Sequence, residues 1–276
     1  MKSFLAFLIT FFFYACASSK EIVYVGSTPA HSVHVRDFLG ISLTDSIDFI
    51  RWKLVLNDND YKLQCEYGIG KPNTSGFIDR KEVNLTGRLN KENNFYYLHN
   101  GNKTLGLLEV NTNLLHLLNA DKKLLAGTGG WSYTLNNTNP KTTNQFNFVS
   151  NPILVKDSIE LVGRTPCQQL SASLQLDKNV ECKRLKWSIV LYTDASGRPT
   201  GCRIKGTAFR NESTKEGNWK IVQGKNGRFI YQLEHPNHKS VIYLVEADEN
   251  ILFFTDAEGN LLVGNEDFSY TLNRRQ

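Results

Sequence analysis

The chain has 276 residues, of which 41% are hydrophobic and 21% charged, and its formal net charge is +5 at pH 7. This charge is small and scattered, with no basic stripe, so we expect no nucleic-acid partner. A chain of this length suits two domains of average size, each large enough to bury its own core.

Residues 1–19 have the layout of a secretory signal peptide and a short polar tether. Their apolar run, 4–14, is too short to span a bilayer, and the small residues Ala15 and Ala17 flank Cys16. Cleavage either leaves Cys16 as an acylated N-terminus or removes it. We expect lipidation of Cys16, and hence an extracytoplasmic protein anchored in the cell envelope. The alternative is a secreted or periplasmic soluble protein.

The rest of the chain is rich in strand signals. Short runs of β-branched and aromatic residues, such as 52–56 and 240–246, alternate with polar turns. Residues 251–254 and 261–263 are expected to form a hairpin, and 36–50 a loop or one short helix. Many short strands joined by hairpins predict an all-β protein.

The sequence repeats itself at an offset of 137 residues. Residues 26–29 (Gly-Ser-Thr-Pro) return as 163–166 (Gly-Arg-Thr-Pro), and 132–136 (Ser-Tyr-Thr-Leu-Asn) return unchanged as 269–273. A period this long indicates two complete domains of one fold rather than a solenoid. We therefore predict two tandem small antiparallel barrels of the calycin or lipocalin type. Their expected bounds are 20–136 and 158–276, with a polar linker at 137–157.

Four aromatic positions recur in both copies, and we expect all of them in strands that contribute to the barrel interiors. The pairs are Trp52 and Trp187, Tyr96 and Tyr231, Trp131 and Phe268, and Tyr133 and Tyr270. A small barrel can also hold one apolar ligand in its mouth, which makes a small apolar molecule an alternative partner.

The cysteines can be interpreted with the two copies aligned. Cys167 corresponds to Ala30 and Cys182 to about Ile47, so both thiols are absent together from the first copy. Residues gained or lost as a pair are expected to be bonded as a pair. We therefore predict a Cys167–Cys182 disulfide, which an oxidising compartment allows.

Cys65 and Cys202 recur at the common offset of 137 residues. They either bridge the two domains across a pseudo-two-fold interface or remain buried thiols, and the sequence leaves both interpretations open.

Two His-x-x-His pairs are weak candidates for a metal site: His31 with His34, and His235 with His238. Both lie in expected loops, and neither pair recurs in the other copy. We interpret them as solvated histidines and predict neither a metal site nor a cofactor.

The sequence contains no established catalytic motif. Asp177, Glu181 and Asp194 are acidic residues in expected loops without an identifiable partner, and we interpret them as solvated carboxylates. We therefore predict no catalytic residue and a protein that is not an enzyme.

Several motifs of the second copy resemble those of NlpE-like envelope lipoproteins. They are Gly163-Arg-Thr-Pro-Cys167, Glu216-Gly-Asn-Trp219, and the closing segment from Leu252 to Leu272. These segments are similar to the family's "G-x-x-P-C-x-x-C" opening, its "G-x-W" strand and its "D-x-x-G" and "Y-x-L" hairpin. The similarity extends more weakly to 26–136 through the duplication. The family's second opening cysteine falls on Leu170, so the C-x-x-C element is incomplete.

The resemblance implies a calycin-like barrel, envelope anchoring, and an association with copper homeostasis and surface-stress sensing. We therefore expect a non-enzymatic envelope lipoprotein that acts as a binding or sensing module. It would attach to the membrane through Cys16 and bind a small apolar ligand or an envelope protein. The alternatives are a structural or assembly protein of the envelope and a copper-binding protein.

Overall fold

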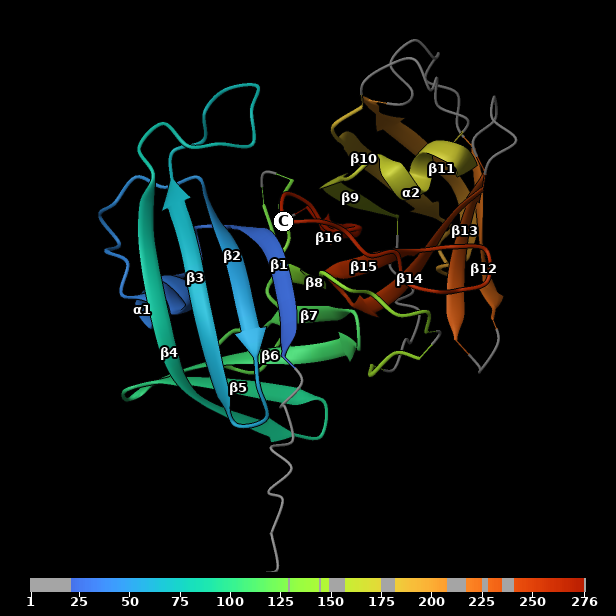
Figure 1. Cartoon of the computed structure of the whole chain (residues 1–276). Coiled ribbons are helices and arrows are strands. Elements are labelled where there is room, and N and C mark those ends of the chain that lie inside the picture. Colours follow the sequence, from blue (N-terminus) through green and yellow to red (C-terminus); the bar gives the residue numbers. More distant parts are fainter. Residues whose placement is uncertain are drawn as a thin grey trace, which may run out of the picture.

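The protein consists of two barrels that lie side by side (Figure 1). The computed structural model describes residues 21–128, 130–143, 145–148, 157–174, 182–207, 217–224, 228–234 and 241–275. Strands of residues 22–137 form one antiparallel sheet and strands of residues 158–274 form another, with no exchange between them. The predicted all-β fold of two tandem barrels is confirmed. Cys16 and the expected signal peptide lie outside the described residues.

The first barrel is closed, and its eight strands pair in chain order. Its strands alternate buried and exposed positions, most regularly along β3, as expected when one face packs on a core and the other meets water. Its elements are β1 (Ile22–Pro29), α1 (Val33–Leu39), β2 (Phe49–Leu56), β3 (Asp60–Gly68), β4 (Lys81–Glu92), β5 (Phe95–Asn100), β6 (Lys103–Asn111), β7 (Leu114–Leu117) and β8 (Thr134–Asn137).

The second barrel pairs its strands in the order β11-β10-β9-β16-β15-β14-β13-β12. The two ends of this sheet meet where Cys202 and Gly217 exchange backbone hydrogen bonds of 2.8 and 2.7 Å. Its elements are β9 (Ser158–Thr165), α2 (Gln168–Ser173), β10 (Leu185–Thr193), β11 (Pro199–Gly206), β12 (Asn218–Gln223), β13 (Phe229–Glu234), β14 (Val241–Asp248), β15 (Ile251–Thr255) and β16 (Thr271–Arg274).

Each barrel encloses its own apolar core. Each core contains a buried tryptophan whose indole donates a hydrogen bond to a threonine hydroxyl. In the first barrel the Trp52 indole donates to the Thr28 hydroxyl over 2.8 Å, and in the second Trp187 donates to Thr165 over 2.9 Å. The recurring tyrosines lie in the same two buried clusters, so their predicted core positions are confirmed. The inward side chains of each barrel, large aromatic rings among them, form one continuous apolar cluster.

Two of the recurring pairs depart from the prediction that all four lie in strands. Trp131 and Phe268 lie in loops, and Tyr133 and Tyr270, although buried in the cores, come just before β8 and β16. The expected hairpin of 251–263 is also shorter than predicted. Leu261 forms only an isolated bridge with Thr255, and the chain then continues through a loop to β16. In the first copy Leu124 likewise forms only an isolated bridge, with Leu118.

A short helix covers one end of each barrel. Helix α1 begins at the N-cap Ser32, whose hydroxyl accepts from the Val35 amide, and it ends at Gly40, which adopts a left-handed conformation with φ +71°. The sequence predicted a loop or one short helix over 36–50, so the helix is confirmed but begins earlier. Phe38 and its neighbours place the apolar face of α1 in the first core.

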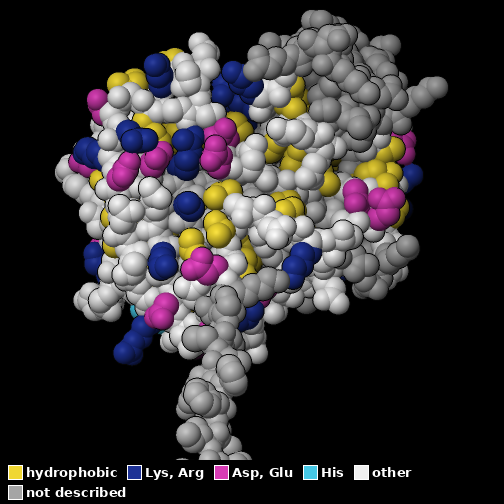
Figure 2. All heavy atoms as spheres, viewed as in Figure 1, with side chains coloured by type: hydrophobic (Ala, Val, Ile, Leu, Met, Phe, Trp, Pro, Cys, Tyr) yellow, Lys and Arg dark blue, Asp and Glu magenta, His cyan; other side chains and the backbone are white. Residues whose placement is uncertain are grey.

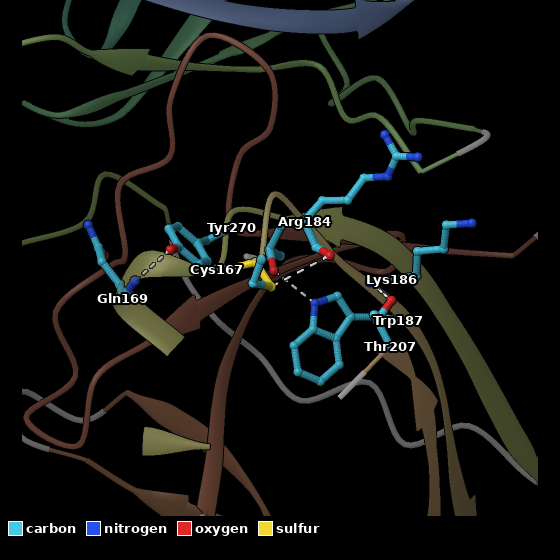
Figure 3. Close-up of a disulfide and its surroundings, with 9 residues drawn as sticks. Cys167, Gln169, Arg184, Lys186, Trp187, Thr207 and Tyr270 are labelled. Atoms are coloured by element: carbon cyan, nitrogen blue, oxygen red, sulfur yellow. Dashed lines mark hydrogen bonds between the residues drawn. A yellow bond between two sulfur atoms is a disulfide. The ribbon is translucent and has the colours of Figure 1, made fainter. Parts of the chain in front are cut away.

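In the second barrel the predicted Cys167–Cys182 disulfide is confirmed, with a Cα–Cα distance of 5.9 Å (Figure 3). It joins the start of α2 to the segment that leads into β10. In the first barrel Ala30 is buried at the position of Cys167, and Ile47 packs against the core near the position of Cys182. Apolar packing therefore takes the place of the covalent link. A disulfide is typical of extracytoplasmic proteins.

A third apolar cluster joins the outer faces of the two barrels. Its members come from both copies and from the connecting segment: Leu108, Val110, Leu114, Leu118, Phe146, Ile230, Val245, Ile251, Phe253 and Leu261. Strand β15 is buried along its whole length because one of its faces meets the second core and the other meets this cluster. We call the contact region between the barrels the seam. Figure 2 shows hydrophobic side chains gathered between the two barrels on the face in view.

Candidate functional site

The seam has an approximate two-fold axis. The Ser132 and Ser269 hydroxyls lie 2.6 Å apart, and the Thr134 and Thr271 hydroxyls lie 3.0 Å apart. Each of these pairs joins residues that are 137 positions apart, which is the offset of the repeat. In a two-fold interface a residue near the axis meets its own equivalent. The two barrels therefore pack as the subunits of a symmetric dimer do, within one chain.

Two asparagines hold the loops on either side of this axis. The Asn136 Oδ1 atom accepts from the Gly264 amide over 2.8 Å, and the equivalent Asn273 Oδ1 accepts from the Gly127 amide over 2.6 Å. A Cβ atom at Gly127 would lie 1.9 Å from the Trp131 carbonyl oxygen, so no side chain fits there. The loop around Gly127 is thus part of the contact between the barrels.

A buried hydrogen-bond chain ends at His116 in the seam. The Ser269 hydroxyl donates to the Thr271 hydroxyl, and the Thr271 hydroxyl lies 3.0 Å from the Thr134 hydroxyl. The Thr134 hydroxyl also lies 3.0 Å from His116 Nδ1. His116 Nε2 lies 2.9 Å from the Leu125 carbonyl oxygen and must donate to it. Nδ1 is therefore the acceptor. Burial lowers the pKa of His116 to about 4 and keeps the ring neutral.

On one side of the axis, the positive charge at the seam is balanced. Arg51 forms an ion pair of 2.8 Å with Asp267 of the other copy, and its guanidinium lies 3.7 Å from Glu66. The neighbouring Ser27 hydroxyl donates to the Glu266 carbonyl oxygen over 2.7 Å. A loop from the second copy thus supplies a carboxylate to a cation of the first.

On the other side of the axis, the same positions carry different charges. Strand pairing sets Lys186 opposite Arg164, as it sets Arg51 opposite Ser27, and Gly130 stands at the position equivalent to Asp267. Among the residues that the structure describes, neither Arg164 nor Lys186 forms an ion pair. Compared with the first half, this half of the seam has one more cation and no equivalent carboxylate.

Aromatic rings support the Arg164 guanidinium. It lies 4.8 Å from the centre of the Trp131 ring, and Trp131 stacks on Phe49 at 5.1 Å. Phe49 in turn stacks on Phe77 at 4.2 Å. Desolvation by burial, together with the positive charge of Arg184, lowers the pKa of Arg164 below its ordinary value. The side chain is therefore held in place on a platform from the other barrel.

Next to Arg164 is a cleft of about 430 Å³ between the barrels, which we call the basic seam cleft. Its volume lies within the range of small-molecule sites. Its wall carries four cationic side chains, Arg164, Lys186, Arg274 and Arg275, against the single carboxylate of Glu160. Glu160 already pairs with Arg275 at 2.9 Å. Figure 3 shows Arg184 and Lys186 extending away from the Trp187 ring, which faces the barrel core.

The two remaining predicted thiols lie in separate cores. Cys65 and Cys202 are both fully buried, and neither forms a disulfide. Strand pairing sets Cys65 opposite Trp52, whereas Cys202 lies opposite Leu191 rather than opposite Trp187. Their shared sequence offset therefore does not give equivalent places in the sheets. Of the two interpretations left open by the sequence, the structure shows buried thiols.

The predicted weak metal candidates lie around α1. His31 precedes the helix, its Nδ1 is 3.1 Å from the Thr128 hydroxyl, and desolvation lowers its pKa, whereas His34 lies on the helix itself. Within the described ranges no group of three or more His, Cys, Asp or Glu side chains is arranged to hold a metal ion. His235 and His238 lie outside those ranges.

Among the acidic residues interpreted as solvated, Asp177 and Glu181 lie outside the described residues. Asp194 is exposed and caps the turn between β10 and β11, where it accepts from the Ser196 hydroxyl over 2.6 Å and from the Arg198 amide over 3.0 Å. These hydrogen bonds, led by that from the Ser196 side chain, lower the pKa of Asp194. The Asp194 carboxylate therefore stabilises this turn.

Sequence reasoning missed Arg164, Lys186 and Trp131 as site residues. The available signal was a set of departures from the repeat: Arg164 replaces the Ser27 equivalent, and Gly130 replaces the Asp267 equivalent. Departures are informative only when the structure shows that both positions face the seam.

No protein-family model, curated protein or solved structure matches this chain. In the described part of the chain, no helix has the length and apolar character needed to cross a membrane.

Proposed function

We propose that the protein is a non-enzymatic, lipid-anchored module of the cell envelope that binds or senses a ligand at the seam between its barrels. The observation that carries this proposal is the basic seam cleft, where Arg164 is held on an aromatic platform without a carboxylate partner among the described residues. Both barrel cores are packed with their own side chains, which favours the seam over the barrel interiors as the binding site.

Envelope anchoring is supported by two features of the chain. Residues 1–19 have the signal-peptide layout with Cys16 after a small residue, and the Cys167–Cys182 disulfide suits an oxidising compartment. The resemblance to NlpE-like lipoproteins agrees with this location. Its copper function receives less support, because the Cys167 sulfur is engaged in the disulfide and Leu170 is buried where a second cysteine would stand.

The anchoring is tested by expressing the full chain in a bacterial host that processes lipoproteins. Wild-type protein should appear in the membrane fraction, and mass spectrometry should find diacylglycerol on Cys16 as the N-terminal residue. Cys16→Ser should release the protein from the membranes. Soluble wild-type protein without a lipid would refute the anchor.

The binding function is tested by native mass spectrometry of the protein purified from that host. A module with a seam ligand should carry a bound small molecule in the wild type and lose it in Arg164→Gln. A bound molecule that is retained equally by Arg164→Gln would place the site elsewhere.

A second candidate function, a protein-interaction module of the envelope, is favoured by a groove on another part of the seam. This groove, of about 770 Å³, draws its lining from both repeats, including Phe95, Leu108 and Leu118 of the first barrel and Ala247 of the second. Its apolar residues are bordered by charged ones such as Lys122, Asp248 and Glu249, and a recess of this mixed kind between two domains suits a partner contact. Chemical cross-linking in intact cells, followed by identification of peptides linked to the nearby Lys122, would test this candidate.

A further inference from the structure

We infer that the basic seam cleft binds a small oxyanion ligand, one that bears a carboxylate or a phosphate group placed between Arg164 and Lys186. This inference rests on the proposed function of the seam and specifies the chemical class of the ligand. It comes from comparing the two sides of the pseudo-two-fold axis, which present the same backbone with different charges.

The balanced side shows what a cation at this position of the seam binds. Arg51 on β2 takes the Asp267 carboxylate at 2.8 Å, and that carboxylate comes from the loop before β16. Lys186 occupies the equivalent place on β10, but the loop before β8 has Gly130 where Asp267 would stand. A ligand oxyanion would supply the charge that the first copy's loop lacks.

Gly130 also makes room for the arginine. A Cβ atom built on Gly130 would lie 2.5 Å from Arg164 Cγ and 2.7 Å from its Nε, and φ at this glycine is +94°. The glycine thus lets the Arg164 side chain pass close to the backbone and reach the Trp131 ring. Replacement of the acidic residue by glycine therefore removes a negative charge and also positions a positive one.

Four cationic residues line one cleft, and Arg164 also lines a neighbouring pocket together with Trp131, Asp48 and Asp267. Arg164, Lys186 and Arg274 line it with no ion-pair partner in the described part of the chain, and Arg275 is shared with Glu160. Guanidinium groups match the planar, bidentate geometry of carboxylates and phosphates, and hydrogen bonds between charged groups are stronger than neutral ones. Ala126, Val162 and Gly163 contribute uncharged surface to the wall, which suits an organic body attached to the anion.

The inference is tested by isothermal titration calorimetry of the purified protein at low ionic strength, with inorganic phosphate in one arm and succinate in the other. We expect saturable binding to one site in at least one arm, and the stronger arm identifies the anion. Arg164→Gln and Lys186→Gln should each weaken that binding about tenfold or more, because each removes a charge-assisted hydrogen bond.

The pseudo-symmetry provides a matched control. Arg51→Gln removes the residue equivalent to Lys186, whose charge Asp267 already balances, and should change anion affinity less than twofold. Circular dichroism melting would confirm that all three variants remain folded. Equal weakening by Arg51→Gln and Lys186→Gln would overturn the inference, because it would show that only overall charge matters.

The remaining outcomes separate this inference from the proposed function. If neither anion binds while native mass spectrometry still finds a molecule lost in Arg164→Gln, the oxyanion assignment is wrong and the seam site stands. If neither anion binds and no such molecule is found, both are wrong. Binding that is unchanged in Arg164→Gln and Lys186→Gln would also overturn the inference.

Discussion

Replacing His116 by phenylalanine should change how the stability of the protein depends on pH. Phe253 occupies the equivalent position of the second copy, so an aromatic ring without a titrating group is compatible with this backbone. In the wild type, burial lowers the pKa of His116 from its ordinary value of 6.5 to about 4. The His116→Phe variant loses this titration together with the hydrogen bonds to Thr134 and Leu125.

The sign and size of the effect follow from proton linkage. Between pH 6.5 and pH 4 the unfolded chain takes up a proton on His116 that the folded protein does not, so acid favours unfolding over this interval. A shift of this size corresponds to about 3 kcal/mol, reached progressively as the pH falls towards 4. Above pH 6.5 the full stabilisation is present, and below pH 4 no more is lost.

The assay is urea denaturation followed by circular dichroism at several pH values from 7 to 4. The free energy of unfolding of the wild type minus that of His116→Phe should fall by about 3 kcal/mol over this range. Leu118→Ala is the matched control, because it truncates a buried side chain of the apolar cluster at the seam, whose Phe253 contacts the His116 ring, without removing a titrating group. A wild-type minus His116→Phe difference that stays constant with pH would refute the reasoning.

Two further changes test the packing of the second barrel and the seam. Replacing Cys167 and Cys182 together by serine should lower the free energy of unfolding by about 3 kcal/mol, because the disulfide closes a loop of this length in the unfolded chain. Urea titration measures this loss. An unchanged unfolding midpoint would mean that the disulfide is not formed. Asn136→Ala and Asn273→Ala should each cost about 2 kcal/mol, because each leaves a glycine amide in the seam without its acceptor. Markedly unequal costs would contradict the pseudo-symmetry.

Much of the fold could be predicted because its determinants are local or repeated. The strand periodicity indicated antiparallel barrels, and the recurrence of Trp52 and Trp187 indicated equivalent cores, which the matching hydrogen bonds to Thr28 and Thr165 bear out. The absence of both Cys167 and Cys182 equivalents from the first copy was sufficient to predict the disulfide.

The seam could not be predicted in this way. Recurrence of Ser132 as Ser269 fits a core position and an interface position equally well, because both roles are preserved when a domain is copied. The alternating pattern also gives no separate signal for β7 and β15, whose outer faces are buried by the other barrel. Trp131 was expected in a strand, but the structure places it in the loop before β8, which begins only at Thr134.

The basic seam cleft was hidden for a related reason. A repeat draws attention to what the copies share, whereas Arg164, Lys186 and Gly130 matter through what they do not share with Ser27, Arg51 and Asp267. The ion pair between Arg51 and Asp267 and the close approach of Arg164 to Gly130 show that these positions face one another across the seam.

The packing of two copies of one barrel around a two-fold axis is tested most directly by cross-linking at the axis. The Ser132 and Ser269 hydroxyls are 2.6 Å apart, so cysteines at both positions should form a disulfide under mild oxidation. Peptide mass spectrometry of the Ser132→Cys, Ser269→Cys double variant should then find the peptides containing residues 132 and 269 joined. Free thiols at both positions after oxidation, in a protein that remains folded, would contradict the claim.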